Sequence, residues 1–309
     1  MRTRRQFLTQ SAAMAGVCCV PWATAFGQAR PAVKFPAAPR DRIAIASYPF
    51  RAFIPGEQYK AGNPVIELKD FAAYVAGKYG AHRIEPWSAH FPATDAKYLD
   101  AFRTAVEKAR AGVANIAVDG DDSPYAADAA QRQRAIAFSK RWIDVAASIA
   151  SPSVRTNVPE AKDSKPDATR LAESLQRVAE YGAAKNVVVH LENDNPVSED
   201  PFFLIEVIEK VNSPWLRALP DFGNTLNARG ADYNYRAMEA LFAHAYGICH
   251  VKDGETDEHG HATQVDLART FAILRKHKFK GYCSMEYDVA SGDVDKATAA
   301  LVAQTEKAL

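Results

Sequence analysis

Short β-branched or apolar runs recur along this chain at a steady spacing, with helical segments between them, and this alternation constrains the fold most. The eight runs are Ile43–Phe50, His82–Trp87, Val113–Gly120, Ser153–Asn157, Asn186–Asn193, Leu216–Phe222, Gly247–Lys252 and Gly281–Tyr287. The segments between them carry helix formers with apolar residues three and four positions apart. They include Asp95–Arg110, Ala126–Ala150, Pro166–Ala184 and Val265–His277. We therefore expect strands and helices to alternate from end to end.

Eight strand–helix units in about 270 residues predict one α/β domain, a (β/α)8 TIM barrel of typical size. The 309-residue chain is 48% hydrophobic, which is enough to build a large core. An open doubly wound sheet is the alternative, but no glycine-rich phosphate turn follows the first strand. We expect residues 42–309 to form the barrel and the proline-containing residues 30–41 to form a linker.

The first 29 residues are expected to be a twin-arginine signal peptide that is removed on export. Arg4 and Arg5 precede an apolar stretch from Ser11 to Ala25, which is too short to span a bilayer. A retained basic amphipathic helix is the alternative. The prediction is a periplasmic protein that is not embedded in the membrane and whose export partner is the twin-arginine machinery.

Charge and cysteine content exclude several other classes. The net charge is +1, so no basic field for nucleic acid exists. Only Cys249 and Cys283 lie beyond the predicted signal peptide, too few for a disulfide framework. We expect both to be buried small hydrophobic residues, and the sequence leaves open whether they are paired.

Four neighbouring predicted strands end in polar residues, where a barrel places its active site. Glu192, Asp221, His250 and Glu286 follow one another at spacings of 29, 29 and 36 residues, about one strand–helix unit each. Alternation points all four inward and points the two cysteines away from His250 and Glu286. The four are predicted to hold one divalent cation. Three carboxylates and an imidazole suit Mn²⁺ best, with Mg²⁺, Co²⁺ or Zn²⁺ as alternatives. A simpler interpretation is that these residues cap the helices that follow.

The chain resembles the xylose isomerase-like barrel superfamily, in particular its sugar phosphate isomerase/epimerase group. The resemblance spans residue 43 to the C-terminus and rests on five strand-end motifs. They are Arg83-Ile84-Glu85, His190-Leu191-Glu192, Asp221-Phe222-Gly223-Asn224, His250-Val251-Lys252-Asp253 and Met285-Glu286. The resemblance implies one metal held by Glu192, Asp221, His250 and Glu286, with the two glutamates also acting as acid and base. Asn224 departs from the ketose epimerase pattern, which has a substrate-contacting His there, and the Arg of that pattern is absent near Lys252. These departures put 3-epimerisation of a free ketose in doubt.

The expected reaction is proton abstraction beside a carbonyl through a metal-stabilised enediolate, with Glu192 and Glu286 as the acid–base pair. Six residues are predicted to bind substrate: Arg155, Glu85, Lys252, Asn224, Trp87 and Tyr48. Arg155 could instead brace the metal carboxylates, and Glu85 and Lys252 could pair with each other. His190 is interpreted as a core or outer-shell group.

Two further clusters have a structural and a functional interpretation. Phe50 and Phe91 join Tyr48 and Trp87 at the mouths of the first two strands, either to stack on a sugar ring or as ordinary packing. The tract Asp257–His261 resembles a metal-binding stretch, but a solvated loop is the preferred interpretation.

The predicted function is therefore a metal-dependent isomerase or epimerase acting on a carbohydrate: a sugar, a keto-sugar or an inosose. A lyase or hydratase that eliminates from a 3-keto-glycoside would use the same site. An endonuclease-like phosphodiesterase would need more strand-end histidines, and a non-catalytic sugar-binding barrel would not need both glutamates. Oligomeric state is left open, and a homo-oligomer is compatible with the sequence.

Overall fold

Strands and helices alternate as expected in the computed structural model, which describes residues 30–56, 65–256, 259–288 and 292–309. The barrel strands are β1 (Ile43–Ala46), β2 (Arg83–Glu85), β3 (Gly112–Val113), β4 (Ile116–Val118), β5 (Ser153–Thr156), β6 (Val188–Glu192), β7 (Leu216–Leu219), β8 (Ile248–Val251) and β11 (Tyr282–Met285). A small antiparallel pair, β9 (Gly254–Thr256) and β10 (Ala262–Gln264), follows β8. The predicted signal peptide lies outside the described residues.

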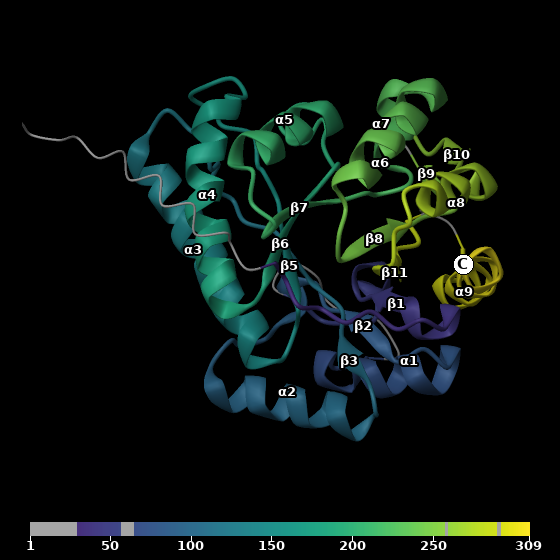
Figure 1. Cartoon of the computed structure of the whole chain (residues 1–309). Helices are drawn as coiled ribbons and strands as arrows, with labels where there is room; N and C mark the ends of the chain where they lie inside the picture. Colours follow the sequence, from purple (N-terminus) through teal and green to yellow (C-terminus); the bar gives the residue numbers. More distant parts are fainter. Residues whose placement is uncertain (1–29, 57–64, 257–258, 289–291) are drawn as a thin grey trace, which may run out of the picture.

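Helices lie around the outside of the strands (Figure 1). They are α1 (Phe71–Tyr79), α2 (Ala96–Lys108), α3 (Ala129–Ser148), α4 (Ala168–Lys185), α5 (Pro201–Val211), α6 (Asn224–Arg229), α7 (Ala231–His244), α8 (Leu267–Lys276) and α9 (Val294–Ala308). Short 3-10 turns are η1 (Pro39–Arg42), η2 (Tyr48–Phe50), η3 (Leu68–Asp70) and η4 (Ser88–His90). No helix in the described part of the chain is long and apolar enough to cross a membrane.

Local sequence explains where most helices begin and end. An aspartate carboxylate accepts a backbone N–H at the start of α2, α3, α4, α5, α8 and α9, which satisfies donors that the first turn leaves free. Asn186 and Asn212 end α4 and α5 in the left-handed conformation that asparagine tolerates. These caps fix the lengths of the connections that carry the strand ends.

Two parallel sheets make the barrel wall. One has the order β3-β2-β1-β11-β8 and the other β4-β5-β6-β7. Isolated parallel bridges, Trp87 with Ala117 and Asp221 with His250, join them along two seams. The predicted third strand is split because the chain changes partner there: β3 pairs with β2, whereas β4 pairs with β5. Every other predicted run contains one barrel strand, and the (β/α)8 fold is confirmed.

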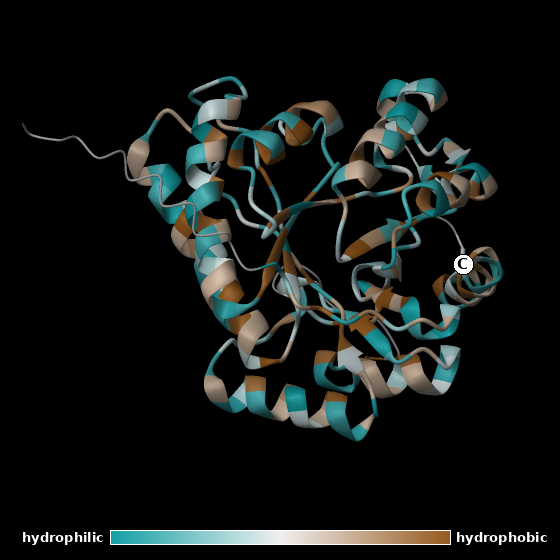
Figure 2. Cartoon of the chain, viewed as in Figure 1, coloured by the Kyte–Doolittle hydropathy of each residue, from teal (hydrophilic) through white to brown (hydrophobic). Residues whose placement is uncertain are grey.

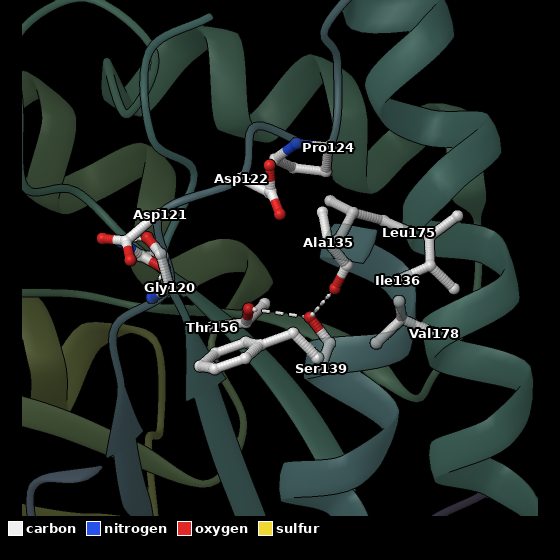
Figure 3. A pocket seen from close by; sticks show the side chains of 12 residues that line it. Gly120, Asp121, Asp122, Pro124, Ala135, Ile136, Ser139, Thr156, Leu175 and Val178 are labelled. Atoms are coloured by element: carbon white, nitrogen blue, oxygen red, sulfur yellow. Dashed lines mark hydrogen bonds between the residues drawn. The ribbon is translucent and has the colours of Figure 1, made fainter. Parts of the chain in front are cut away.

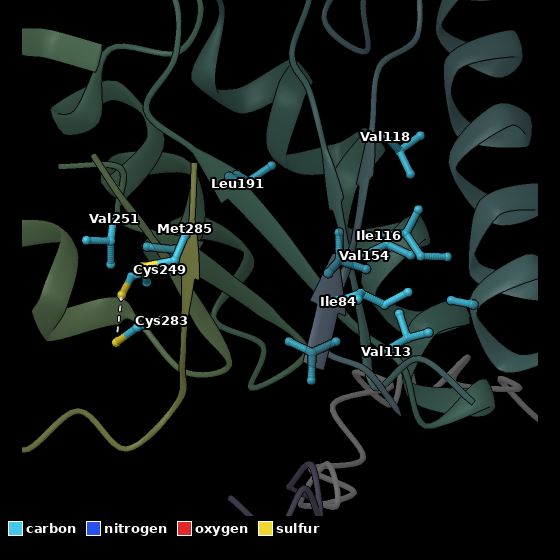
Figure 4. Close-up of a cluster of buried hydrophobic side chains, with 14 of the residues drawn as sticks. Ile84, Val113, Ile116, Val118, Val154, Leu191, Cys249, Val251, Cys283 and Met285 are labelled. Atoms are coloured by element: carbon cyan, nitrogen blue, oxygen red, sulfur yellow. Dashed lines mark hydrogen bonds between the residues drawn. The ribbon is translucent and has the colours of Figure 1, made fainter. Parts of the chain in front are cut away.

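Hydrophobic residues concentrate on the strands and on the helix faces toward them (Figure 2). Cys249 and Cys283 belong to this layer between strands and helices, away from His250 as alternation predicted. Both are free thiols with no exposed surface, and their sulfurs are 3.7 Å apart across β8 and β11 (Figure 4). They are small buried groups, as expected.

The predicted linker lies against the barrel. Phe35 packs edge-on against Tyr246 and Tyr282, with ring centroids 5.5 and 5.6 Å apart. The Tyr246 hydroxyl donates to the carbonyl oxygen of Pro31 at 2.9 Å. Phe35 also contacts the small apolar cluster that includes Ile248 and Tyr282, at the amino ends of their strands. This segment therefore covers the end of the barrel opposite the predicted site.

Candidate metal centre

The four predicted ligands meet at the carboxyl ends of the strands. Glu192 ends β6, Asp221 follows β7, His250 lies in β8 and Glu286 follows β11. None is more than 6% exposed. One ligand atom from each lies within 4.8 Å of the other three. Parallel strands bring residues a full strand–helix unit apart to one depth, so spacing alone predicted the group.

The ring of His250 points its Nδ1 atom at the carboxylates. Nδ1 is 2.6 Å from Glu192 Oε1, 3.1 Å from Glu286 Oε2 and 3.9 Å from Asp221 Oδ2. Burial disfavours a charged imidazole, but Glu192 and Glu286 outweigh it and raise the pKa of His250 well above its usual value. Burial is likewise outweighed at Glu286, whose pKa His250 and Lys252 lower to about 2.

Asp221 supplies a direct test of whether a cation fits. Its Oδ1 accepts the backbone N–H groups of Gly223 and Asn224 at 2.8 and 2.7 Å, so the capping interpretation holds for this oxygen. Its Oδ2 is buried without a hydrogen-bond partner among the described residues. Burial raises the pKa of Asp221 to about 7. Lys252 Nζ is 3.7 Å from this oxygen, beyond hydrogen-bond distance. A buried oxygen without a hydrogen bond, facing two other carboxylates and an imidazole nitrogen, is what a divalent cation would satisfy. The residues fit such an ion.

Two buried cations flank the group. Arg155 Nε is 2.9 Å from Glu192 Oε2, and the same guanidinium pairs with Asp119. Lys252 Nζ donates to Asn224 Oδ1 at 2.6 Å and lies 3.5 Å from Glu286 Oε2. Arg155 therefore braces a predicted ligand, which was one of its two expected roles.

Glu85 and Lys252 do not pair with each other, contrary to one alternative. Lys252 lies among Asp221, Glu255 and Glu286, whereas Glu85 contacts His250 Nε2 at 3.0 Å. Glu85 is 1% exposed, below the imidazole, and does not line the cavity. Glu85 is therefore not placed to contact substrate, contrary to the prediction. A side chain that points inward from the end of β2 meets the His250 ring instead.

A cavity of about 320 Å³ opens above the cluster. Of the predicted site residues it contains Tyr48, Trp87, Arg155, Asn224, Lys252, Glu192 and Glu286. The Tyr48 and Trp87 rings meet edge to face at 5.1 Å. Phe50 has no exposed surface and Phe91 packs on Phe102 and Trp142, so those two aromatics are packing.

Sequence reasoning missed several polar residues of the cavity wall. They are Asp119, Asn157, Asp194, Glu255 and Asp288. The first three follow β4, β5 and β6 by one or two residues. Asp119 and Asn157 lie inside the predicted third and fourth runs and Asp194 directly follows the fifth, so their place at the ends of these runs was the available signal. Glu255 comes from β9, which lies between the predicted seventh strand and the tract interpreted as a loop. His259 and His261 are exposed beyond it, and the other acids of that tract lie outside the described residues.

A second, smaller hollow of about 120 Å³ lies where β4 and β5 end against α3 and α4 (Figure 3). The Ser139 and Thr156 hydroxyls are 3.2 Å apart there, with Asp121 and Asp122 at its edge. It shares only Asn157 with the larger cavity and contains none of the four clustered residues. The chemistry therefore belongs to the larger cavity.

Residues 73–306 match the family described as xylose isomerase-like TIM barrel. The chain belongs to this family. No curated protein matches it. A solved xylose isomerase-like barrel protein from Mycobacterium smegmatis, in complex with magnesium, has the same fold. Its TM-score is 0.67 at 15% sequence identity, and the match covers 86% of this chain and 95% of that one.

Two other solved structures of this fold are epimerases. A D-allulose 3-epimerase from Methylomonas sp. in complex with D-allulose has a TM-score of 0.68 and 14% identity, covering 90% of this chain and 99% of that one. A 3-keto-D-glucoside 4-epimerase from E. coli has a TM-score of 0.64 and 13% identity, covering 86% and 99%. At these identities the likeness establishes the fold of this xylose isomerase-like barrel.

Proposed function

We propose that this protein is a divalent-metal-dependent isomerase or epimerase that removes a proton next to the carbonyl of a sugar, keto-sugar or inosose. The observation that carries the proposal is the buried group of Glu192, Asp221, His250 and Glu286 beneath a polar cavity. Membership of the xylose isomerase-like family and the sugar epimerases among the solved neighbours support it.

The ion would be held by the four clustered side chains, with Mn²⁺ as the proposed metal and Mg²⁺, Co²⁺ or Zn²⁺ as alternatives. When bound, a divalent ion supplies a Lewis acid that polarises the carbonyl and stabilises the enediolate. The magnesium in the Mycobacterium smegmatis structure supports a hard cation in this fold.

Glu192 and Glu286 are proposed as the acid–base pair, one to remove the substrate proton and the other to return it. Both carboxylates line the cavity and both lie beside His250 Nδ1, at 2.6 and 3.1 Å. They come from β6 and β11, which belong to different sheets, and so can approach a substrate from two sides.

An uncharged polyhydroxy substrate suits the cavity best. Its wall carries six carboxylates against two cations, Arg155 and Lys252, and both cations are already paired with carboxylates. A phosphorylated substrate would meet net repulsion even with a divalent ion bound. Asn224 and Lys252 are proposed to donate to substrate hydroxyls, and Tyr48 and Trp87 to contact a sugar ring.

Elimination from a 3-keto-glycoside is the second candidate. It needs an acid to protonate the departing oxygen, and Glu192 and Glu286 both line the cavity where that oxygen would lie. The E. coli neighbour, which acts on a 3-keto-D-glucoside, favours including this substrate class. A phosphodiesterase is disfavoured because the cluster contains one histidine and the cavity wall is acidic.

Export through the twin-arginine machinery to the periplasm remains part of the proposal. It rests on Arg4, Arg5 and the apolar stretch that follows them. The amino-terminal residue of protein recovered from the periplasm tests it: the expected start is near residue 30, and a start at Met1 would contradict it.

Solvent-deuterium incorporation into a panel of ketoses, inososes and 3-keto-glycosides tests the reaction. We expect about one divalent ion per chain in the wild type and exchange that falls by about 10²–10⁴-fold in Glu192→Gln and in Glu286→Gln. Glu199→Gln is the matched control, because Glu199 is also buried, 3% exposed, but bonds to Val158 and Asn195 outside the cluster. A wild type that exchanges fully without metal would contradict the proposal.

A further inference from the structure

Glu85 occupies a place that the proposed reaction does not use. It ends β2 with 1% exposure and is absent from the cavity wall. Its two carboxylate oxygens lie 3.1 and 3.0 Å from His250 Nε2. The other ring nitrogen, Nδ1, faces Glu192 and Glu286. Glu85 is therefore on the opposite side of the imidazole from the metal cluster.

Two further buried side chains fix the orientation of Glu85. Asn115, which has no exposed surface, donates from Nδ2 to Glu85 Oε1 at 2.7 Å. Ser153, 2% exposed, donates to Asn115 Oδ1 at 2.6 Å. An ionised carboxylate only accepts hydrogen bonds, so the Asn115 NH₂ group faces Glu85 and the Asn115 oxygen faces the Ser153 hydroxyl. Glu85 thus receives donors from both sides and acts as an acceptor only.

The chemistry of imidazole gives this arrangement a consequence. A neutral ring carries its proton on one nitrogen and offers a lone pair on the other. A cation bound among Glu192, Asp221 and Glu286 would take the place of the proton on Nδ1, and a carboxylate at Nε2 would keep the other proton there, which leaves the Nδ1 lone pair for the cation. The ring is already oriented with Nδ1 toward the three carboxylates.

We propose that Glu85, supported by Asn115 and Ser153, is a positioning residue that holds His250 with Nδ1 presented to the divalent ion. The inference rests on the proposed function, since it assumes that His250 binds the ion. It assigns Glu85 a role in metal affinity instead of substrate contact.

Calorimetric titration of the metal-stripped full chain with Mn²⁺ is the first test. The Glu85→Gln side chain has one acceptor oxygen instead of two, whereas Asn115 Nδ2 and His250 Nε2 both point toward it. One of these two contacts is lost, so the affinity for Mn²⁺ should fall about 10–100-fold. Glu199→Gln should bind within about threefold of wild type, since its contacts are remote from His250. Asn115→Ala keeps Glu85 but removes its hydrogen bond from Asn115, so the affinity for Mn²⁺ should fall at least about threefold. This variant replaces Glu85→Gln as the test if Glu85→Gln does not fold.

The ring tautomer is a second readout that a merely structural acid would not change. In the Zn²⁺-loaded wild type, ¹⁵N NMR should find the His250 proton on Nε2, with the signal assigned by its loss in His250→Gln. Unchanged Mn²⁺ affinity in Glu85→Gln, or a proton on Nδ1 in the wild type, would overturn the inference alone. A wild type that binds no divalent ion would overturn the proposed function as well, so the two failures are distinguishable.

Discussion

At the residue scale, His190 is a buried base that has no partner for either ring nitrogen among the described residues. It lies in β6 with no exposed surface, and its ring packs so closely on Gly247 that a Cβ there would meet Cε1 at 2.7 Å. Burial lowers its pKa to about 3. His190 is therefore neutral in the folded protein across the physiological range.

Replacing His190 by Met should change the pH dependence of stability. The folded pKa of about 3 lies below the ordinary 6.5, so the unfolded chain binds the extra proton and wild-type stability is lost as pH falls from 6.5 toward 3. We expect the unfolding free energy of His190→Met to be within about 1 kcal/mol of wild type at pH 7 and about 2 kcal/mol above it at pH 5. Urea denaturation at both pH values measures this, and parallel pH profiles would contradict it.

The sequence predicted which residues form the buried cluster of carboxylates and histidine, but not how all the neighbouring residues are used. Glu192, Asp221, His250 and Glu286 follow from strand periodicity, since their depth depends on the backbone alone. The partner of Glu85 does not, because a side chain that points inward can face either the cavity or a neighbouring ring. Asp119 lies inside the predicted third run, but β4 ends one residue before it, and Asp194 lies beyond β6, so the alternation applies to neither.

At the scale of elements, every predicted strand position contains a strand, and the four named helices are present with bounds within three residues of those expected. What the pattern did not predict is the break between β3 and β4 or the packing of the proline-containing segment. Both depend on contacts with residues distant in sequence: Asn115 with Glu85, and Phe35 with Tyr246 and Tyr282. Local periodicity carries no information about such contacts.

The packed segment makes a testable contribution to stability. Phe35→Ala should lower the unfolding free energy by about 2 kcal/mol, because the half-buried ring loses two aromatic contacts. Metal binding should be unchanged, since the segment covers the far end of the barrel. Phe202→Ala, which removes a 41% exposed ring from α5, is the control and should cost less than about 1 kcal/mol. Equal thermal stability of both variants and wild type would show that residues 30–38 do not pack in solution.

At the scale of the whole molecule, metal loading should raise thermal stability. Mn²⁺ at 100 times its dissociation constant adds about 2.7 kcal/mol to the folded state, which corresponds to a melting temperature higher by about 5 °C for a chain of this size. Calorimetric scans with Mn²⁺ and after chelation measure the shift, with NaCl of equal ionic strength as control. Asp221→Asn should abolish it, and a shift that survives this substitution would place the ion elsewhere.

The division of the wall into two sheets has a consequence for assembly. Glu192 and Asp221 come from the sheet that contains β6 and β7, whereas His250 and Glu286 come from the sheet that contains β8 and β11. Neither sheet can therefore bring the four side chains together on its own, and the group exists only after the Asp221–His250 seam has closed. On the proposed function, an ion held by all four side chains would thus report that the two sheets have joined.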